Sequence, residues 1–115
     1  MLTVYGIKNC DTVKKALKWL DANGVEYAFH DLRAEPLSEA KLSDWVAGLG
    51  SKKLVNKAST TWRQLDDATR TEVENGNALP ALIANPTLIK RPVLEGNNIL
   101  HVGFKEADYN ALLNH

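Results

Sequence analysis

The sequence predicts an α/β domain whose elements follow the order strand, helix, strand, then helices, then a β-hairpin and a last helix. Three features predict this order. Residue periodicity changes from strand-like to helical and back near the N-terminus, apolar residues in the middle have helical spacing, and Gly96-Asn97-Asn98 separates two strand-like runs near the end. A length of 115 residues, with 44% hydrophobic and 24% charged residues, suits one globular domain.

The N-terminal part is predicted to form a βαβ unit. Residues 2–6 are rich in strand formers, and apolar and polar residues alternate again over residues 25–30. Between them, a helix is predicted from Asp11 to Asn23-Gly24, because apolar residues recur at helical spacing: Val13, Ala16, Leu17 and Leu20. The two strands should be parallel.

The middle is predicted to be helical. Ser38 can cap a helix that Gly50 ends and whose apolar positions are Leu42, Trp45, Val46 and Leu49. Residues 52–61 are polar and are predicted to be irregular, residues 62–73 have weak helical periodicity, and residues 79–84 form an apolar run predicted to be a buried helix.

The end of the chain returns to strands. Residues 92–95 and 99–102 are predicted to pair as a β-hairpin, and residues 105–113 to form a last helix. No internal repeat, low-complexity stretch or linker interrupts the chain, so one domain over residues 1–115 is expected, with a core of about residues 1–33 and 88–115 around a helical insert of about residues 36–87.

Composition excludes several classes of function. The 14 Lys and Arg balance the 14 Asp and Glu, so no broad nucleic-acid surface is expected. No apolar run approaches the roughly 20 residues of a membrane span, and the N-terminus lacks the basic start of a signal peptide. The single cysteine excludes an internal disulfide and a thiolate metal cluster. A monomer in the reducing cytoplasm is the expectation.

Cys10 lies between the first strand and the first turn of the following helix. The first N–H groups of a helix are unpaired and carry partial positive charge, so they stabilise a thiolate. Lys8 adds positive charge and Asp11 opposes it. Loops at the carboxyl ends of parallel strands also bind ligands in α/β folds. Cys10 is therefore a candidate reactive thiol, and a buried structural cysteine is the alternative.

Two arginines are further candidates. Arg91 precedes Pro92 at the start of the hairpin and can present a planar fork to a carboxylate or another anion, although a solvated basic dipeptide explains Lys90-Arg91 equally well. Arg63 lies near the start of a predicted helix, where the dipole disfavours a cation, so a partner for it is plausible. From sequence alone, most X-Pro bonds are trans.

The remaining polar residues receive structural interpretations. His30, His101 and His115 lack the spacing of metal ligands, and no metal site is expected. The pair Asp66-Asp67 is expected to form a solvated helix face. No phosphate-binding loop, dinucleotide fingerprint or zinc-protease motif is present.

Three blocks, in order and at suitable spacing, resemble the ArsC/Spx family of thioredoxin-like proteins, and within it the small YffB-type proteins. They are residues 4–16, residues 88–93 and Val102-Gly103-Phe104. The resemblance implies a thioredoxin-like core, similar to that of glutaredoxins, with an all-helical insert after the second strand. It also implies that Cys10 is the nucleophile, that Arg91 assists it, and that Pro92 is a cis-proline facing the thiol. Arg63 is the candidate for an oxyanion-binding arginine of the insert.

Three departures from the family pattern bear on function. Val13 stands where many Spx proteins have the second cysteine of CxxC, so an internal disulfide switch is impossible. The stretch 100–103 lacks the third arginine of the arsenate reductases. Gly6-Ile7-Lys8-Asn9 replaces their His-Asn-Pro type of loop, which makes arsenate a doubtful natural substrate.

The expected function is that of a glutathione-dependent monothiol oxidoreductase. Cys10 would attack a mixed disulfide or another oxidised substrate, and glutathione, a co-substrate and not a bound cofactor, would resolve the intermediate. Its expected binding residues are Lys8, Asn9, Arg63, Arg91 and Pro92, whose backbone would pair with the extended peptide. The alternatives are arsenate reduction with glutathione and, in another class, Spx-like binding of the RNA polymerase α subunit.

Overall fold

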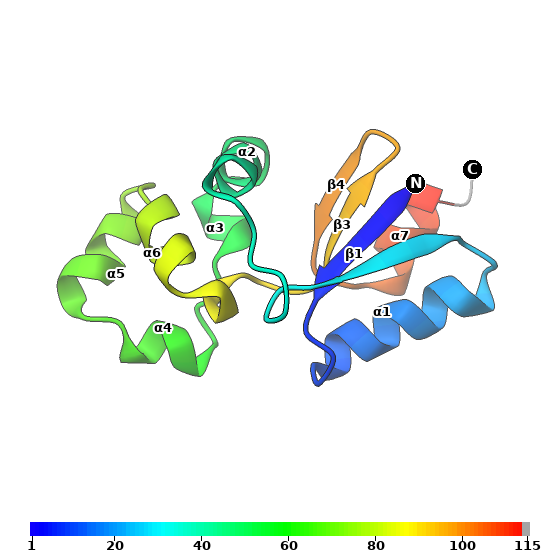
Figure 1. Cartoon of the computed structure of the whole chain (residues 1–115), viewed down its shortest axis with the longest axis horizontal. Coiled ribbons are helices and arrows are strands. Elements are labelled where there is room, and N and C mark those ends of the chain that lie inside the picture. Colours follow the sequence, from blue (N-terminus) through cyan, green and yellow to red (C-terminus); the bar gives the residue numbers. More distant parts are fainter. Residues whose placement is uncertain (114–115) are drawn as a thin grey trace. The chain divides into compact units, whose positions relative to one another are not determined.

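The computed structural model describes residues 1–113 and divides into two compact units (Figure 1). One, here called the sheet unit, contains Met1–Asp31 and the chain from Arg91 onward. The other, the helical unit, is the continuous segment Leu32–Lys90 and includes the predicted insert. The predicted end of the domain, with His115, lies outside the described residues.

The sheet unit contains a four-stranded sheet in the order β2-β1-β3-β4. Its strands are β1 (Leu2–Gly6), β2 (Tyr27–Asp31), β3 (Val93–Gly96) and β4 (Ile99–Val102). β1 and β2 are parallel, whereas β3 is antiparallel to both β1 and β4. The predicted βαβ unit, hairpin and thioredoxin-like core are therefore confirmed.

Two helices of the sheet unit, α1 (Asp11–Ala22) and α7 (Glu106–Leu113), pack on one face of this sheet (Figure 1). Burial of apolar surface stabilises this packing, because the apolar face of α1 meets alternate residues of the strands. The fully buried cluster between them consists of Leu2, Val4, Ala16, Leu20, Leu94 and Tyr109.

The turn between β3 and β4 explains why the hairpin closes tightly. Asn97 and Asn98 both have positive φ, at 51° and 66°. Two-residue hairpin turns of this hand match the twist of the flanking strands, and asparagine tolerates the left-handed region better than most residues.

The helical unit is built from short helices. They are α2 (Glu39–Leu49), α3 (Ser51–Leu54), α4 (Thr60–Gln64), α5 (Asp67–Glu74), α6 (Leu79–Ala84) and the 3₁₀ helix η1 (Pro86–Leu88). Ser38 caps α2 as predicted, because its hydroxyl accepts a hydrogen bond from the N–H of Lys41 at 3.1 Å. Within residues 1–113, no helix is long and apolar enough to cross a membrane.

Two predictions for this unit are wrong in part. Residues 52–54, expected to be irregular, belong to α3, where Leu54 is buried. The helix expected over residues 62–73 is two helices, since Leu65 is extended and Asp66 begins a new helix by accepting the N–H of Thr69 at 2.7 Å. Asp66 is therefore the N-cap of α5 and not a position on a helix face. Both Asp66 and Asp67 are exposed to solvent, as expected, and Asp67 pairs with Arg70.

One connection bears on the site. The segment that leads to Arg91 is fixed within the helical unit by two hydrogen bonds, from Lys90 N–H to the Leu54 carbonyl at 2.7 Å and from Asn56 N–H to the Leu88 carbonyl at 2.9 Å. An isolated bridge pairs Val55 with Ile89 between them.

Candidate functional site

The single cysteine occupies the N-cap position of α1. Its backbone is extended, its carbonyl accepts the N–H of Lys14 at 3.0 Å, and its own N–H donates to the Ile7 carbonyl at 3.1 Å. The half-buried thiol makes no capping hydrogen bond. The first-turn N–H groups thus remain available to a negative charge beside Sγ, which is the condition for a reactive thiol.

A close approach between β1 and α1 determines where the thiol lies. A Cβ added at Gly6 would sit 2.7 Å from Cγ2 and 3.0 Å from Cγ1 of Val13. The fully buried Val13 is in the first turn of α1, three residues after Cys10. Gly6 therefore allows the start of the helix to pack directly on the end of the strand.

The sheet register brings Arg91 and Pro92 to the same edge as Cys10. Tyr5 pairs with Val93, so the loop that follows β1 and the residues that precede β3 meet at one end of the sheet. Asp31 ends β2 at this edge as well, because it pairs with Gly6. The peptide bond between Arg91 and Pro92 is cis, as the family resemblance implies.

A backbone hydrogen bond from Gly103, the residue after β4, anchors Pro92. The N–H of Gly103 donates to the Pro92 carbonyl at 2.8 Å, and Gly103 has a φ of 85° that favours glycine. This bond uses one lone pair of the Pro92 carbonyl, and proline has no N–H that could donate to a substrate. An extended substrate that pairs with Pro92 would have to use the second lone pair.

The polar residues at this edge of the sheet unit carry both signs of charge. Lys8 and Asn9 are exposed in the loop before Cys10, and Asp11 is exposed in the first turn of α1. The side chain of Arg91 is half-buried, with its Nε shielded from solvent. Five of the predicted site residues therefore lie at the same end of the sheet unit: Lys8, Asn9, Cys10, Arg91 and Pro92.

Arg63 belongs to the helical unit, where it lies in α4. Its guanidinium donates to the Ala58 carbonyl at 3.0 Å, and its own carbonyl accepts from Arg70 at 3.4 Å. The oxyanion role that the resemblance assigns to Arg63 stays a prediction.

Sequence reasoning assigned no role to Asp31, and it named Gly6 and Gly103 only as members of the blocks that resemble the family. A glycine directly after a strand and before a helix is a signal for close backbone approach, and it was available for Gly6. Asp31 required the observation that parallel strands end at the same edge. The role of Gly103 depends on a hydrogen bond across the hairpin register, for which the sequence carries no local signal.

Two histidines pack against aromatic rings. The ring centroid of His30 lies 4.9 Å from that of Tyr5, and the ring centroid of His101 lies 6.0 Å from that of Tyr109. His101 also approaches Asp108, with 3.7 Å between Nε2 and Oδ2. His115 lies outside the described residues.

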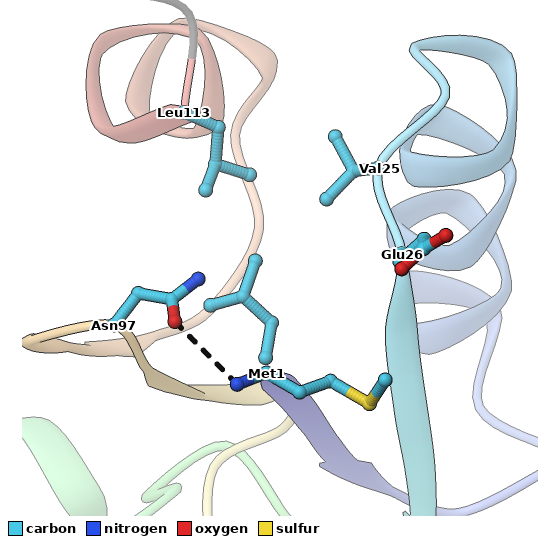
Figure 2. Close-up of a pocket in the computed structure, with 6 residues that line it drawn as sticks. Met1, Val25, Glu26, Asn97 and Leu113 are labelled. Atoms are coloured by element: carbon cyan, nitrogen blue, oxygen red, sulfur yellow. Dashed lines mark hydrogen bonds between the residues drawn. The ribbon is translucent and has the colours of Figure 1, made fainter.

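A hollow of about 530 Å³ lies at the other end of β1 (Figure 2). There the N-terminal ammonium of Met1 donates to Oδ1 of Asn97 at 3.5 Å. Val25, Glu26 and Leu113 also line this hollow. None of the predicted site residues lines it, and Cys10 follows the opposite end of β1.

Comparison with solved structures identifies similar proteins. A YFFB protein is 42% identical to this chain, with coverage of 98% of this chain and 99% of that one and a TM-score of 0.91. An arsenate reductase (ArsC) related protein from Brucella melitensis is also 42% identical, with coverage of 99% and 95% and a TM-score of 0.77.

Comparison with curated proteins adds a different functional class. A global transcriptional regulator, Spx, from Streptococcus mutans is 25% identical over 98% of this chain and 83% of its own length. Similar proteins therefore include both an arsenate reductase related protein and a transcriptional regulator. A family model described as the ArsC family matches residues 5–112, which confirms the resemblance carried by the three sequence blocks. This chain belongs to the ArsC family.

Proposed function

We propose that this protein is a monothiol oxidoreductase that uses Cys10 as its nucleophile and glutathione as the resolving thiol. The position of the single cysteine carries the proposal. Cys10 occupies the N-cap position of α1, at the end of the sheet where Arg91 and Pro92 precede β3. The similarity to an arsenate reductase related protein supports thiol chemistry.

The proposed reaction has two exchange steps. The Cys10 thiolate attacks the glutathione sulfur of a mixed disulfide, the old S–S bond breaks, and the substrate thiolate leaves and takes up a proton. Cys10 then carries glutathione in a new disulfide. Because the chain has no second cysteine, a second glutathione thiolate attacks this bond, releases the Cys10 thiolate and leaves as glutathione disulfide.

Five residues are proposed to hold glutathione. Arg91 and Lys8 supply cations for its two carboxylates, and Asn9 supplies an amide that can donate and accept. The free lone pair of the Pro92 carbonyl accepts from the peptide backbone. Arg63 is the fifth, proposed on the anion-binding role that the family resemblance implies.

The test compares wild-type protein with Cys10→Ser in the reduction of a glutathione mixed disulfide. We expect Cys10→Ser to abolish turnover and the glutathione adduct seen by intact mass. Arg91→Gln should retain the adduct but raise KM for glutathione about tenfold, since a charge-assisted pair to a carboxylate contributes roughly 1.5 kcal/mol. Full activity of Cys10→Ser would overturn the mechanism.

Arsenate is the second candidate substrate, favoured by the arsenate reductase related relative. The absence of an arginine from residues 100–103 argues against it. Turnover of arsenate and of a mixed disulfide by the same preparation, each with glutathione, separates the two. A kcat/KM for arsenate above that for the disulfide would favour arsenate reduction.

The third candidate is a regulator that binds the RNA polymerase α subunit. The similarity to Spx over most of the chain supports it. Purified α subunit binding equally to wild-type protein and to Cys10→Ser would indicate a role that does not need the thiol. No binding to either would remove this candidate.

A further inference from the structure

Four lysines lie close to Cys10 in the sequence and are all exposed. Lys8 is in the preceding loop, and α1 carries the other three: Lys14, Lys15 and Lys18. Those three occupy the side of α1 away from the sheet, because Val13, Ala16 and Leu20 point into the core. We call Lys14, Lys15 and Lys18 the lysine face of α1.

The positive charge of this region is only partly balanced locally. Residues 8–21 contain four lysines and two acidic residues, Asp11 and Asp21, so cations are in excess here although the whole chain has zero formal net charge. None of the four lysine side chains forms a hydrogen bond or ion pair with another residue among 1–113. The partial positive charge of the α1 N-terminus adds to theirs.

Glutathione alone does not account for so many cations. It has two carboxylates, and the proposed function already assigns them to Arg91 and Lys8. From Cys10 to Lys18 the helix rises about 12 Å, at 1.5 Å per residue. The lysine face therefore extends about two turns beyond the thiol and fits an elongated anionic partner.

We propose that the substrate of Cys10 is a protein mixed disulfide whose modified cysteine is flanked by acidic residues, and that this acidic segment lies along the lysine face of α1. The inference rests on the proposed function and specifies its substrate class. Charge complementarity across such a surface raises the association rate and selects among partners, and it weakens as salt increases.

The experiment uses three glutathionylated peptides of equal length, each with one cysteine flanked by glutamate, serine or lysine. For the wild-type protein we expect kcat/KM for the glutamate peptide to exceed that for the serine peptide about tenfold at low salt, with the lysine peptide slowest. The difference should shrink at about 0.5 M salt, where the Debye length falls below roughly 5 Å.

A matched pair of variants locates the effect. Lys14→Glu/Lys15→Glu/Lys18→Glu should reverse the order of the glutamate and lysine peptides. Lys52→Glu/Lys53→Glu/Lys105→Glu changes the net charge equally at exposed positions outside α1 and should keep the wild-type order. Equal effects of the two triple variants would overturn the proposal, because net charge alone would then explain the preference.

Two further readouts separate the possible failures. If the wild-type protein reduces the mixed disulfide of glutathione with a small, uncharged thiol but does not discriminate among the peptides, this inference fails and the proposed function stands. If it reduces none of them, the proposed function fails. With Cys10→Ser, tighter binding of an oligonucleotide than of a glutamate peptide of equal charge would identify a nucleic-acid surface and overturn the proposal.

Discussion

Replacement of Gly6 by alanine tests the packing that positions the thiol. The new Cβ would lie 2.7 Å from Cγ2 of Val13, whereas carbon atoms make favourable contacts at about 3.5–4.0 Å. The helix start must therefore move by about 1 Å, because β-branched Val13 is fully buried and stiff at χ1. Overpacking of this kind lowers the free energy of unfolding by about 1–3 kcal/mol. The smaller conformational freedom of alanine in the unfolded chain offsets about 0.4–1 kcal/mol of this loss. We expect a net destabilisation of about 1–2 kcal/mol.

The assay is urea unfolding of a double-mutant cycle with Gly6→Ala, Val13→Ala and both together. Val13→Ala alone should destabilise by loss of buried methyl groups, but it also makes space for the new Cβ. The double variant should therefore be more stable than the sum of the single effects by about 1 kcal/mol or more. Additivity within about 0.5 kcal/mol would refute the contact as the reason for glycine.

Substitutions at three other positions test single features of the fold. No residue among 1–113 accepts a hydrogen bond from the buried hydroxyl of Tyr109, so Tyr109→Phe should raise the free energy of unfolding at neutral pH by about 1 kcal/mol in urea. Burial also raises the pKa of Tyr109, so the wild-type protein should lose stability above about pH 10, and Tyr109→Phe should remove this loss. Hydrogen bonds from the side chain and backbone of Thr69 hold the pKa of Asp66 below its ordinary value. The ionised Asp66 carboxylate stabilises the fold above its unfolded-state pKa, and this stabilisation is lost as pH falls through its lower folded-state pKa. The thermal unfolding temperature should therefore fall less steeply for Asp66→Asn than for the wild-type protein between about pH 5 and 2. Gly103→Ala should lower the free energy of unfolding by about 1–2 kcal/mol, and Gly103→Asn should lower it less, because asparagine tolerates the positive φ of this position. Equal changes in the thermal unfolding temperature of the two variants would contradict this reason.

The elements with strong local signals could be predicted from sequence. In α1 the apolar period, the polar first turn and Asn23-Gly24 all agree, and the helix ends at Ala22 as expected. In the hairpin, two turn residues separate two strand-like runs. In the helical unit, by contrast, Ser59 and Asp66 start short helices whose few apolar residues do not establish a period.

The candidate site could be predicted by residue but not by geometry. The location of Cys10 at a strand–helix junction is a local feature, so its position at the helix cap was accessible. That Arg91 and Pro92 reach the same edge depends on the pairing of Tyr5 with Val93, which is non-local. The contact of Gly6 with Val13 likewise depends on how closely a helix approaches a strand, and residue spacing does not specify this.

The discontinuity of the sheet unit has a consequence for folding during synthesis. The helical unit is one continuous segment, so its whole sequence leaves the ribosome before β3 and β4 do. Until then α1 and β1 lack Leu94 and Tyr109, two members of their buried cluster, and their apolar faces stay exposed to misassociation. The edge that holds Cys10 therefore assembles last, and nascent chains that stop before Arg91 should carry the cysteine without the partners proposed to make it function.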